Sequence, residues 1–194
     1  MNWDQRVDHW NQTFPKYPPT IYSHGWVYGV WYCSKAWTKN VIYGQYPRRF
    51  LERALALWPD VTADRILQVC SGSVTEPGVC LDISRQFEPT VQASAETLPF
   101  QDGAFDLILY DPPYSAEDAQ MYGQEKAPRW SRVRPEFLRV LRTGGHIGVL
   151  HKHYPNHRRR EMKLRGLIAI VTGFLSMTRM FSIFEKLPTS TEVE

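Results

Sequence analysis

The stretch FDLILYDPPYS, residues 105–115, joins the pattern of a buried strand to a pair of prolines. Apolar residues fill most of its first half, which is typical of a strand covered on both faces of a parallel sheet. Because Pro112 and Pro113 cannot donate hydrogen bonds to a neighbouring strand, the strand has to end before them. Asp111 and Tyr114 are therefore expected at the carboxyl end of a strand, the edge at which α/β sheets bind ligands.

Six other segments are short apolar runs bounded by glycine, proline or polar residues, and each predicts a strand. They are residues 65–70, 78–84, 91–95, 146–152, 167–174 and 179–187. The last two are separated by a short turn around Ser176, which indicates an antiparallel hairpin. Helical spacing of apolar residues is found at residues 46–59, 116–124 and 130–141.

The connections between the first strands are too short to hold helices. Only residues 73–78 separate the first predicted strand from the second, whereas a parallel crossover usually needs a dozen or more residues. The sequence therefore predicts an α/β fold with a seven-stranded, mostly parallel sheet, an antiparallel C-terminal hairpin and several crossover helices missing.

The first 42 residues hold five of the seven tryptophans, a density of aromatic residues that disordered segments lack. We expect residues 1–42 to form an aromatic-rich segment that packs on a domain made of residues 43–194. This segment would cover the sheet surface that the missing helices leave bare. A homodimer or a partner subunit is the alternative cover.

Composition excludes several classes of protein. A hydrophobic share of 43% with 22% charged residues is ordinary for a globular domain. No apolar run reaches 18 residues and the N-terminus lacks a signal-peptide pattern, so no membrane partner and a cytoplasmic location are expected. Cys33, Cys70 and Cys80 lack the spacing of a zinc cluster, and His151 and its neighbouring histidines lack a carboxylate partner, so no metal site is expected.

Positive charge is concentrated in residues 151–165, HKHYPNHRRREMKLR. The segment has six lysines and arginines, with Glu161 as its one acidic residue. On charge alone, such a block fits a phosphate backbone as well as a solvated surface.

Together, these features resemble the Rossmann-like S-adenosylmethionine-dependent methyltransferases over about residues 43–187. DPPY, Asp111–Tyr114, looks like the catalytic motif of amino-methyltransferases that modify exocyclic amines, above all N6 of adenine in DNA. VLRTGGHIGVLH, residues 140–151, is similar to the helix, glycine turn and fifth strand of the superfamily. YPRRFLERAL, residues 46–55, resembles the helix before the first strand, whose leading residues border the methionine end of the cofactor.

The resemblance implies S-adenosyl-L-methionine as cofactor. Gly72 would let the backbone approach it, and Asp82 would accept hydrogen bonds from both ribose hydroxyls. Taken alone, each of these residues also suits an ordinary turn. The cofactor-binding residues implied are Tyr46, Cys70, Ser71, Gly72, Ser73, Asp82, Ile83, Ser94 and Ala95.

The implied catalytic residues are Asp111, Pro112, Pro113 and Tyr114. The Asp111 carboxylate and the Pro112 carbonyl can accept the hydrogens of an exocyclic amine and aim its lone pair at the methyl group. The prolines fix the direction of that carbonyl, and Tyr114 offers a ring on which an extruded base can stack.

The expected function is therefore methyl transfer to an exocyclic amino group of a nucleobase, with adenine N6 in DNA as first choice. The alternatives are the same chemistry on RNA, on cytosine N4 or on a small molecule, or a catalytically inactive methyltransferase-like binding subunit. The sequence departs from the family at Gln68 and Cys70, where typical members carry an acid. Only residues 115–129 are left to form a substrate loop, so low sequence specificity is expected.

Overall fold

The computed structural model describes residues 1–16, 21–23, 26–34, 45–122, 124–173 and 176–188. In this part of the chain nine strands form one sheet, in the order β1-β2-β8-β9-β7-β6-β3-β4-β5. The strands are β1 Ile21–Ser23, β2 Trp26–Tyr32, β3 Ile66–Val69, β4 Val79–Asp82, β5 Val91–Gln92, β6 Phe105–Tyr110, β7 Leu141–His151, β8 Met162–Val171 and β9 Arg179–Lys186.

The sheet is mostly parallel, as predicted. Strands β5, β4, β3, β6 and β7 pair in parallel, and β9 then runs antiparallel between β7 and β8. Two strands were not predicted: β2 pairs in parallel with β8, and β1 pairs antiparallel with β2. Both come from the aromatic-rich N-terminal segment, whose pairing partner is far away in the sequence. The boundary expected between residues 42 and 43 lies outside the described residues.

Four α-helices accompany the sheet in the described residues: α1 Trp3–Thr13, α2 Phe50–Leu55, α3 Ala116–Met121 and α4 Trp130–Val140. The last three lie in the segments with helical spacing. Helix α1 was not predicted; it begins with a capping box, in which Asn2 and Gln5 satisfy each other's backbone amides. The connections β3–β4, β4–β5 and β5–β6 contain no α-helix, and only the short 3-10 turn Arg85–Phe87 interrupts them. The missing crossover helices are thus confirmed.

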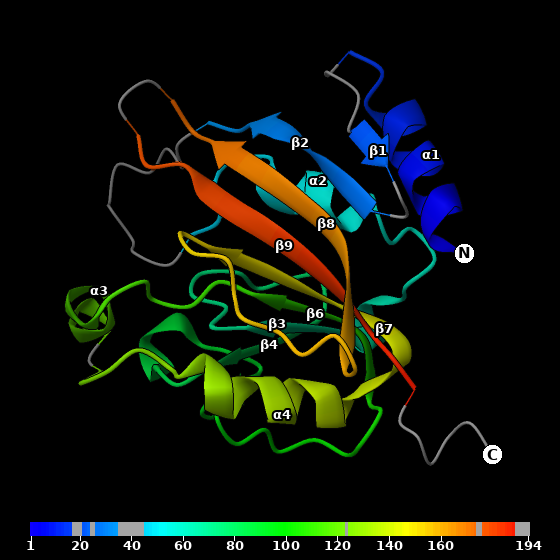
Figure 1. Cartoon of the computed structure of the whole chain (residues 1–194). Helices are drawn as coiled ribbons and strands as arrows, with labels where there is room; N and C mark the ends of the chain where they lie inside the picture. The colour runs from blue at the N-terminus through cyan, green and yellow to red at the C-terminus, as the bar shows by residue number, and fades with distance from the viewer. Residues whose placement is uncertain (17–20, 24–25, 35–44, 123, 174–175, 189–194) are drawn as a thin grey trace.

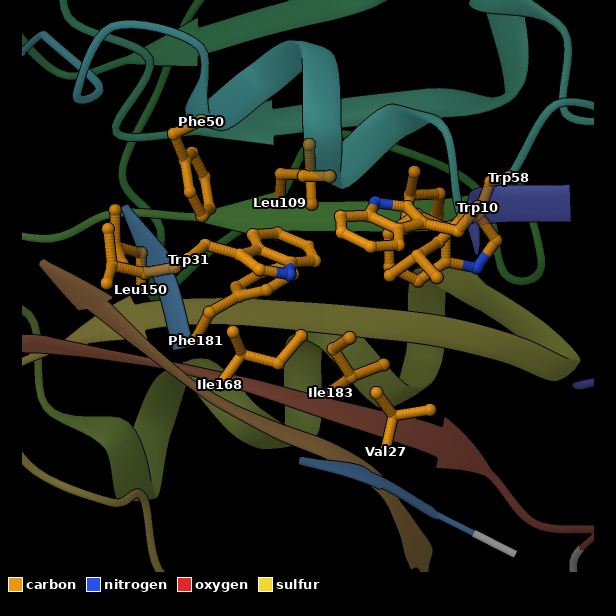
Figure 2. Close-up of a cluster of buried hydrophobic side chains, with 14 of the residues drawn as sticks. Trp10, Val27, Trp31, Phe50, Trp58, Leu109, Leu150, Ile168, Phe181 and Ile183 are labelled. Carbon is orange, nitrogen blue, oxygen red and sulfur yellow. The ribbon is translucent and has the colours of Figure 1, made fainter. Parts of the chain in front are cut away.

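One face of the sheet is covered by α1 and α2, whose buried side chains belong to one cluster with those of the strands. Figure 1 shows α2 behind β2 and β8, and α1 beside β1. The rings of Trp10 in α1 and Trp31 in β2 stack with centroids 5.2 Å apart and an interplanar angle of 5°. Figure 2 shows Trp31 among Phe50, Leu150 and Phe181, side chains that come from α2, β7 and β9. N-terminal aromatic side chains therefore fill the space over a sheet that has few helices.

The opposite face is packed by α4 alone among the described helices. Its apolar stripe, Val133, Phe137 and Val140, is buried against side chains of β6 and β7. The Tyr110 and Phe137 rings meet edge to face at 5.1 Å. This helix fixes the strand that carries the DPPY stretch.

Two contacts explain how β3 reaches β4 through so few residues. Gly78 has a φ of +99°, and a Cβ there would lie 2.6 Å from the Ile66 carbonyl oxygen, so only glycine fits. The buried Gln68 donates from Nε2 to the Pro77 carbonyl at 3.2 Å and accepts from the Tyr46 hydroxyl at 3.2 Å. The glutamine that stands near the family's acidic position thus ties down the shortened connection.

His146 links α1 to the sheet and gives a pH-dependent stability. Its ring stacks on Trp3 at 5.3 Å, and its Nε2 has no hydrogen-bond partner among the described residues. Burial, reinforced by Arg6, lowers the pKa of His146 to about 3. Between that pKa and about 6.5 the unfolded chain binds a proton that the folded chain does not, so stability falls as the pH drops through this window.

We predict that His146→Phe removes this dependence. Between pH 7 and pH 5 the wild type should lose about 2 kcal/mol of unfolding free energy more than the variant. Urea unfolding at both pH values measures the difference, and a change at the exposed His153 to phenylalanine serves as the control. Equal pH slopes for the wild type and His146→Phe would contradict the assignment.

Candidate functional site

The carboxyl ends of β3, β4, β5 and β6 meet at one edge of the sheet, and a cavity of about 260 Å³ lies there. Small-molecule sites usually hold roughly 300–1,000 Å³, so this cavity is slightly smaller than that range. Among the residues predicted from the sequence, its lining contains Cys70, Gly72, Asp82, Ile83, Ser94, Ala95, Asp111 and Pro113.

Asp82 ends β4 with its carboxylate held in one orientation. Its Oδ2 accepts from the Gly72 backbone amide at 3.0 Å, and its Oδ1 accepts from the Ser84 amide at 2.9 Å. A carboxylate oxygen has a second lone pair, so both can still accept from a ligand. Next to it, the exposed side chain of Ile83 adds an apolar surface to the cavity.

The turn after β3 brings backbone close to Asp82. Cys70 and Gly72 both have positive φ, 56° and 53°. The Ser71 amide donates to the Leu81 carbonyl at 3.1 Å, which pins the turn to β4. Burial raises the pKa of the Cys70 thiol well above its usual value, and the carboxylates of Asp82 and Asp111 add to the shift. The uncharged thiol of Cys70 is thus part of the cavity wall.

The residues that follow β5 form a third part of the cavity wall, after Asp82 and the turn that follows β3. Ala93 donates its backbone amide to the Asp82 carbonyl at 3.1 Å, and Glu96 donates its own to Ser94 Oγ at 3.1 Å. Ala95 is buried beneath this turn. With Leu81 and Ile83, these small and apolar residues form a slot beside a fixed carboxylate. Such a slot suits a ligand that combines a planar ring with hydroxyl groups.

Asp111 lies at the end of β6 with its side chain 13% exposed. Its Oδ1 accepts from the Tyr114 hydroxyl at 2.6 Å, and the Arg179 guanidinium lies 3.9 Å from its Oδ2. Burial raises the pKa of Asp111 to about 6, although Arg179 and the Tyr114 hydrogen bond act in the opposite direction. Above that pH the cavity contains a desolvated anion.

The Tyr114 ring lies between the His151 ring and the Arg179 guanidinium. His151 meets it edge to face at 5.0 Å, and the Arg179 guanidinium carbon lies 5.6 Å from its centroid. Its backbone amide donates to Asp118 Oδ2 at 3.2 Å. In this arrangement Tyr114 does not line the cavity, because its hydroxyl is turned toward Asp111.

Four further residues of the predicted site lie outside the cavity lining. The Tyr46 ring packs on Phe50 at 5.1 Å while its hydroxyl donates to Gln68, on the face covered by α1 and α2. Ser71 is buried, and its Oγ has no hydrogen-bond partner among the described residues. Pro112 is buried, and Ser73 lies in the turn without reaching the lining.

The far wall of the cavity was not predicted residue by residue. It comes from the segment between DPPY and α4, which the sequence marked only as a substrate loop, and from the first turn of α4. Glu96 anchors it, accepting from the Arg129 amide at 2.8 Å and pairing with Arg132 at 3.2 Å. Burial raises the pKa of Tyr122 to about 12. The residues of this wall are Tyr122, Gln124, Lys126, Ala127, Pro128, Arg129 and Arg132.

Two further features are absent from the part of the chain that the structure describes. No group of three or more histidine, cysteine, aspartate or glutamate side chains is placed to hold a metal ion. None of its helices combines the length and the apolar character that a membrane crossing requires.

No protein-family model and no curated protein sequence matches the chain. Among solved structures it is similar to TrmN from Thermus thermophilus, at 18% identity and a TM-score of 0.53, over 76% of this chain and 51% of that one. It thus spans about half the length of TrmN.

Two further similarities have lower TM-scores. An rRNA methylase from Streptococcus thermophilus matches at 12% identity and a TM-score of 0.45, over 66% of this chain and 91% of that one. Geranyl diphosphate C-methyltransferase from Streptomyces coelicolor matches at 8% identity and a TM-score of 0.42, over 95% and 97% of the two chains. The similarity to TrmN shows that the chain has a methyltransferase-like fold.

Asp111 is expected to destabilise the fold in its ionised form. Its pKa in the folded chain, about 6, lies above the unfolded value of 3.8, so the native state holds a proton that the unfolded chain has already lost. Stability should therefore fall as the pH rises through this window, by up to about 3 kcal/mol.

We predict that Asp111→Asn removes this loss, so that at pH 8 the variant is as stable as the wild type or more stable. Urea unfolding at pH 5 and pH 8 measures it, with the exposed Asp102→Asn as a matched control. A variant that is less stable than the wild type at pH 8 but not at pH 5 would contradict the burial argument.

Proposed function

We propose that the protein is an S-adenosylmethionine-dependent methyltransferase that acts on an exocyclic amino group of a nucleobase, with adenine N6 in DNA as the favoured substrate. One observation carries the proposal: the buried Asp111 carboxylate lines the same cavity as Asp82 and the turn after β5. The carboxylate that would bind the cofactor, Asp82, and the carboxylate that would accept the amine hydrogens, Asp111, thus line one cavity at the edge of a methyltransferase-like sheet.

The residues of the cavity fit the adenosine part of this cofactor. Asp82 would accept from the ribose hydroxyls, and Ile83 and Ala93 would contact the two sides of the adenine region. Gly72 leaves room for the backbone to approach the methionine part. When bound, the cofactor supplies a methyl group on a positively charged sulfur.

Asp111 would accept a hydrogen of the substrate amine and hold its lone pair toward that methyl group. An exocyclic amine is a poor nucleophile, so the main contributions are positioning and a fixed negative charge rather than a strong base. The Tyr114 hydroxyl already occupies Oδ1 of Asp111. The amine can donate to Oδ2, which lies 3.9 Å from Arg179, or it can replace the tyrosine at Oδ1, which would free the Tyr114 ring to stack on the base.

A base inside a duplex cannot reach a carboxylate at the edge of the sheet. The substrate is therefore an extruded base or a single strand. The preference for adenine rests on the resemblance of DPPY to the adenine-modifying enzymes. The same chemistry on RNA, cytosine N4 or a small molecule remains the second candidate, and a catalytically inactive binding subunit the third.

Calorimetry with S-adenosylmethionine and its demethylated product tests the cofactor site. We expect both to bind the wild type, and Asp82→Ala to weaken binding at least tenfold because two hydroxyl acceptors are lost. Asp102→Ala, at an exposed carboxylate, is the control. Absence of binding to the wild type would overturn the proposal and favour the inactive-subunit alternative.

Transfer of labelled methyl groups to adenine-containing single-stranded DNA tests Asp111. We expect Asp111→Ala to lower the rate by about 100-fold or more while cofactor affinity stays within a few-fold. Since the ionised Asp111 carboxylate is a stronger hydrogen-bond acceptor than the protonated acid, the wild-type rate should rise through pH 6 and then level off.

Arg179→Met should move this midpoint to higher pH, because the guanidinium opposes protonation of Asp111. Single-turnover rates between pH 5 and pH 8 measure both effects, with Arg142→Met at the opposite edge of the sheet as the control. A flat profile, or full activity in Asp111→Ala, would show that another group orients the amine.

A further inference from the structure

One face of β2 is aromatic and open to solvent. Val27 and Trp31 point into the core on the side of α1 and α2. The alternate residues point the other way and keep large exposed fractions: Trp26 37%, Tyr28 41%, Val30 40% and Tyr32 62%. We call these four residues the aromatic face.

Strand β8 extends this surface. The register places Leu167 beside Tyr28, Ala169 beside Val30 and Val171 beside Tyr32, and all three are only half-buried. Helix α4, which covers this side of the sheet, belongs to a cluster that includes side chains of β6, β7 and the start of β8 (Met162 and Leu164), and this cluster does not include Leu167, Ala169 or Val171. Figure 1 shows β2 and β8 on the near side with α2 behind them and α4 below, so no described helix covers the aromatic face.

A basic ridge runs beside the aromatic face. It consists of exposed or half-buried cationic side chains in the connection from β7 to β8: Lys152, Arg158, Arg159 and Arg160. The connection lies over β9, because Tyr154 and His157 pack on Phe184 with ring centroids 6.0 Å and 5.0 Å away.

The ridge carries more positive charge than its own acid can neutralise. Glu161 pairs with Arg158 and with Arg134 of α4. In the described part of the chain, Arg159 and Arg160 have no carboxylate within salt-bridge distance. This surface is therefore suited to an anionic partner.

The aromatic face leads to Asp111. Tyr32, Val171, Arg179 and His151 all lie at the edge of the sheet that holds the cavity, and His151 touches Tyr114. From β6 to β2 there are four strand spacings of about 4.8 Å, which puts Tyr32 about 19 Å from Asp111. A nucleic-acid strand that occupies 4–16 nucleotides, the range of single-strand binding domains, would span this distance.

We propose that the aromatic face and the basic ridge bind single-stranded DNA, the bases stacking on Trp26, Tyr28 and Tyr32 and the phosphates meeting the ridge. Exposed aromatic rings beside a positively charged track are the two features by which proteins hold single strands without reading sequence. A second copy of the chain would bring a like-charged ridge and a net charge of +3, whereas a polyanion complements both.

The inference rests on the proposed function for the role of the bound strand, but binding itself requires neither cofactor nor adenine. The test therefore uses a fluorescein-labelled oligothymidylate of about 20 nucleotides, long enough for one site, and measures fluorescence anisotropy without cofactor. Loss of cofactor binding would overturn the proposed function and leave this measurement unaffected.

We expect the full chain to bind the oligothymidylate, and Tyr28→Ala and Tyr32→Ala each to lower the affinity by about 5- to 150-fold. Val30→Ala, between them on the same face, should stay within twofold. Thermal unfolding of all three variants shows whether they fold. Variants of Tyr28 and Tyr32 that fold and bind as tightly as the wild type would overturn the proposal.

The double change Arg159→Gln and Arg160→Gln should reduce the slope of log affinity against log salt by about 1.4, since two phosphate contacts are lost. Arg142→Gln at the opposite edge should leave the slope unchanged. Tighter binding of oligouridylate than of oligothymidylate would overturn the choice of DNA. A dimer in sedimentation that the tyrosine variants abolish, with DNA binding intact, would make the face a subunit interface instead.

Discussion

The stacking of Trp10 on Trp31 is the contact on which the rest of the structure depends. Three connections between parallel strands lack a helix, so one face of the sheet would otherwise be exposed to water. The aromatic side chains of α1 and β2 fill that space, and burying rings of this size contributes several kcal/mol. The same strand presents its alternate aromatic residues to solvent on the other face. The seven-residue strand β2 thus completes the core with one of its faces and presents exposed aromatic side chains to solvent on the other.

A second constraint acts at the other end of the sheet, where Asp111 is buried with little compensation. Its carboxylate has one hydrogen bond from Tyr114 and a guanidinium at 3.9 Å, which is less than a buried charge needs for full stabilisation. Asp82 is different, because two backbone amides hold it. Asp82 is therefore a structural part of its turn, whereas Asp111 can still accept hydrogen bonds from another donor. Such unsatisfied groups are characteristic of functional sites.

The strands around the cavity and the place of Asp111 at a strand end could be predicted from the sequence, because prolines, glycines and short apolar runs are local signals. Strand β2 and helix α1 could not be predicted. The same aromatic residues can pack on many partners, and β8, with which β2 pairs, comes in the sequence only after all the strands of the central sheet. Tyr46 stays a predicted cofactor-binding residue, and the hydrogen bond of its hydroxyl to Gln68 had no local signal in the sequence. The far wall of the cavity was predicted only as a substrate loop, because the residue that holds it in place, Glu96, comes from a different part of the chain.

The central claim is that Asp111 presents the amino group of an adenine to the methyl group of the cofactor. The most direct measurement is mass spectrometry of nucleosides from single-stranded DNA that has been incubated with the protein and isotopically labelled S-adenosylmethionine. The account predicts label in N6-methyldeoxyadenosine with the wild type, and none with Asp111→Asn, a variant expected to remain folded. Label in another nucleoside, or in N6-methyldeoxyadenosine made by Asp111→Asn, would contradict it.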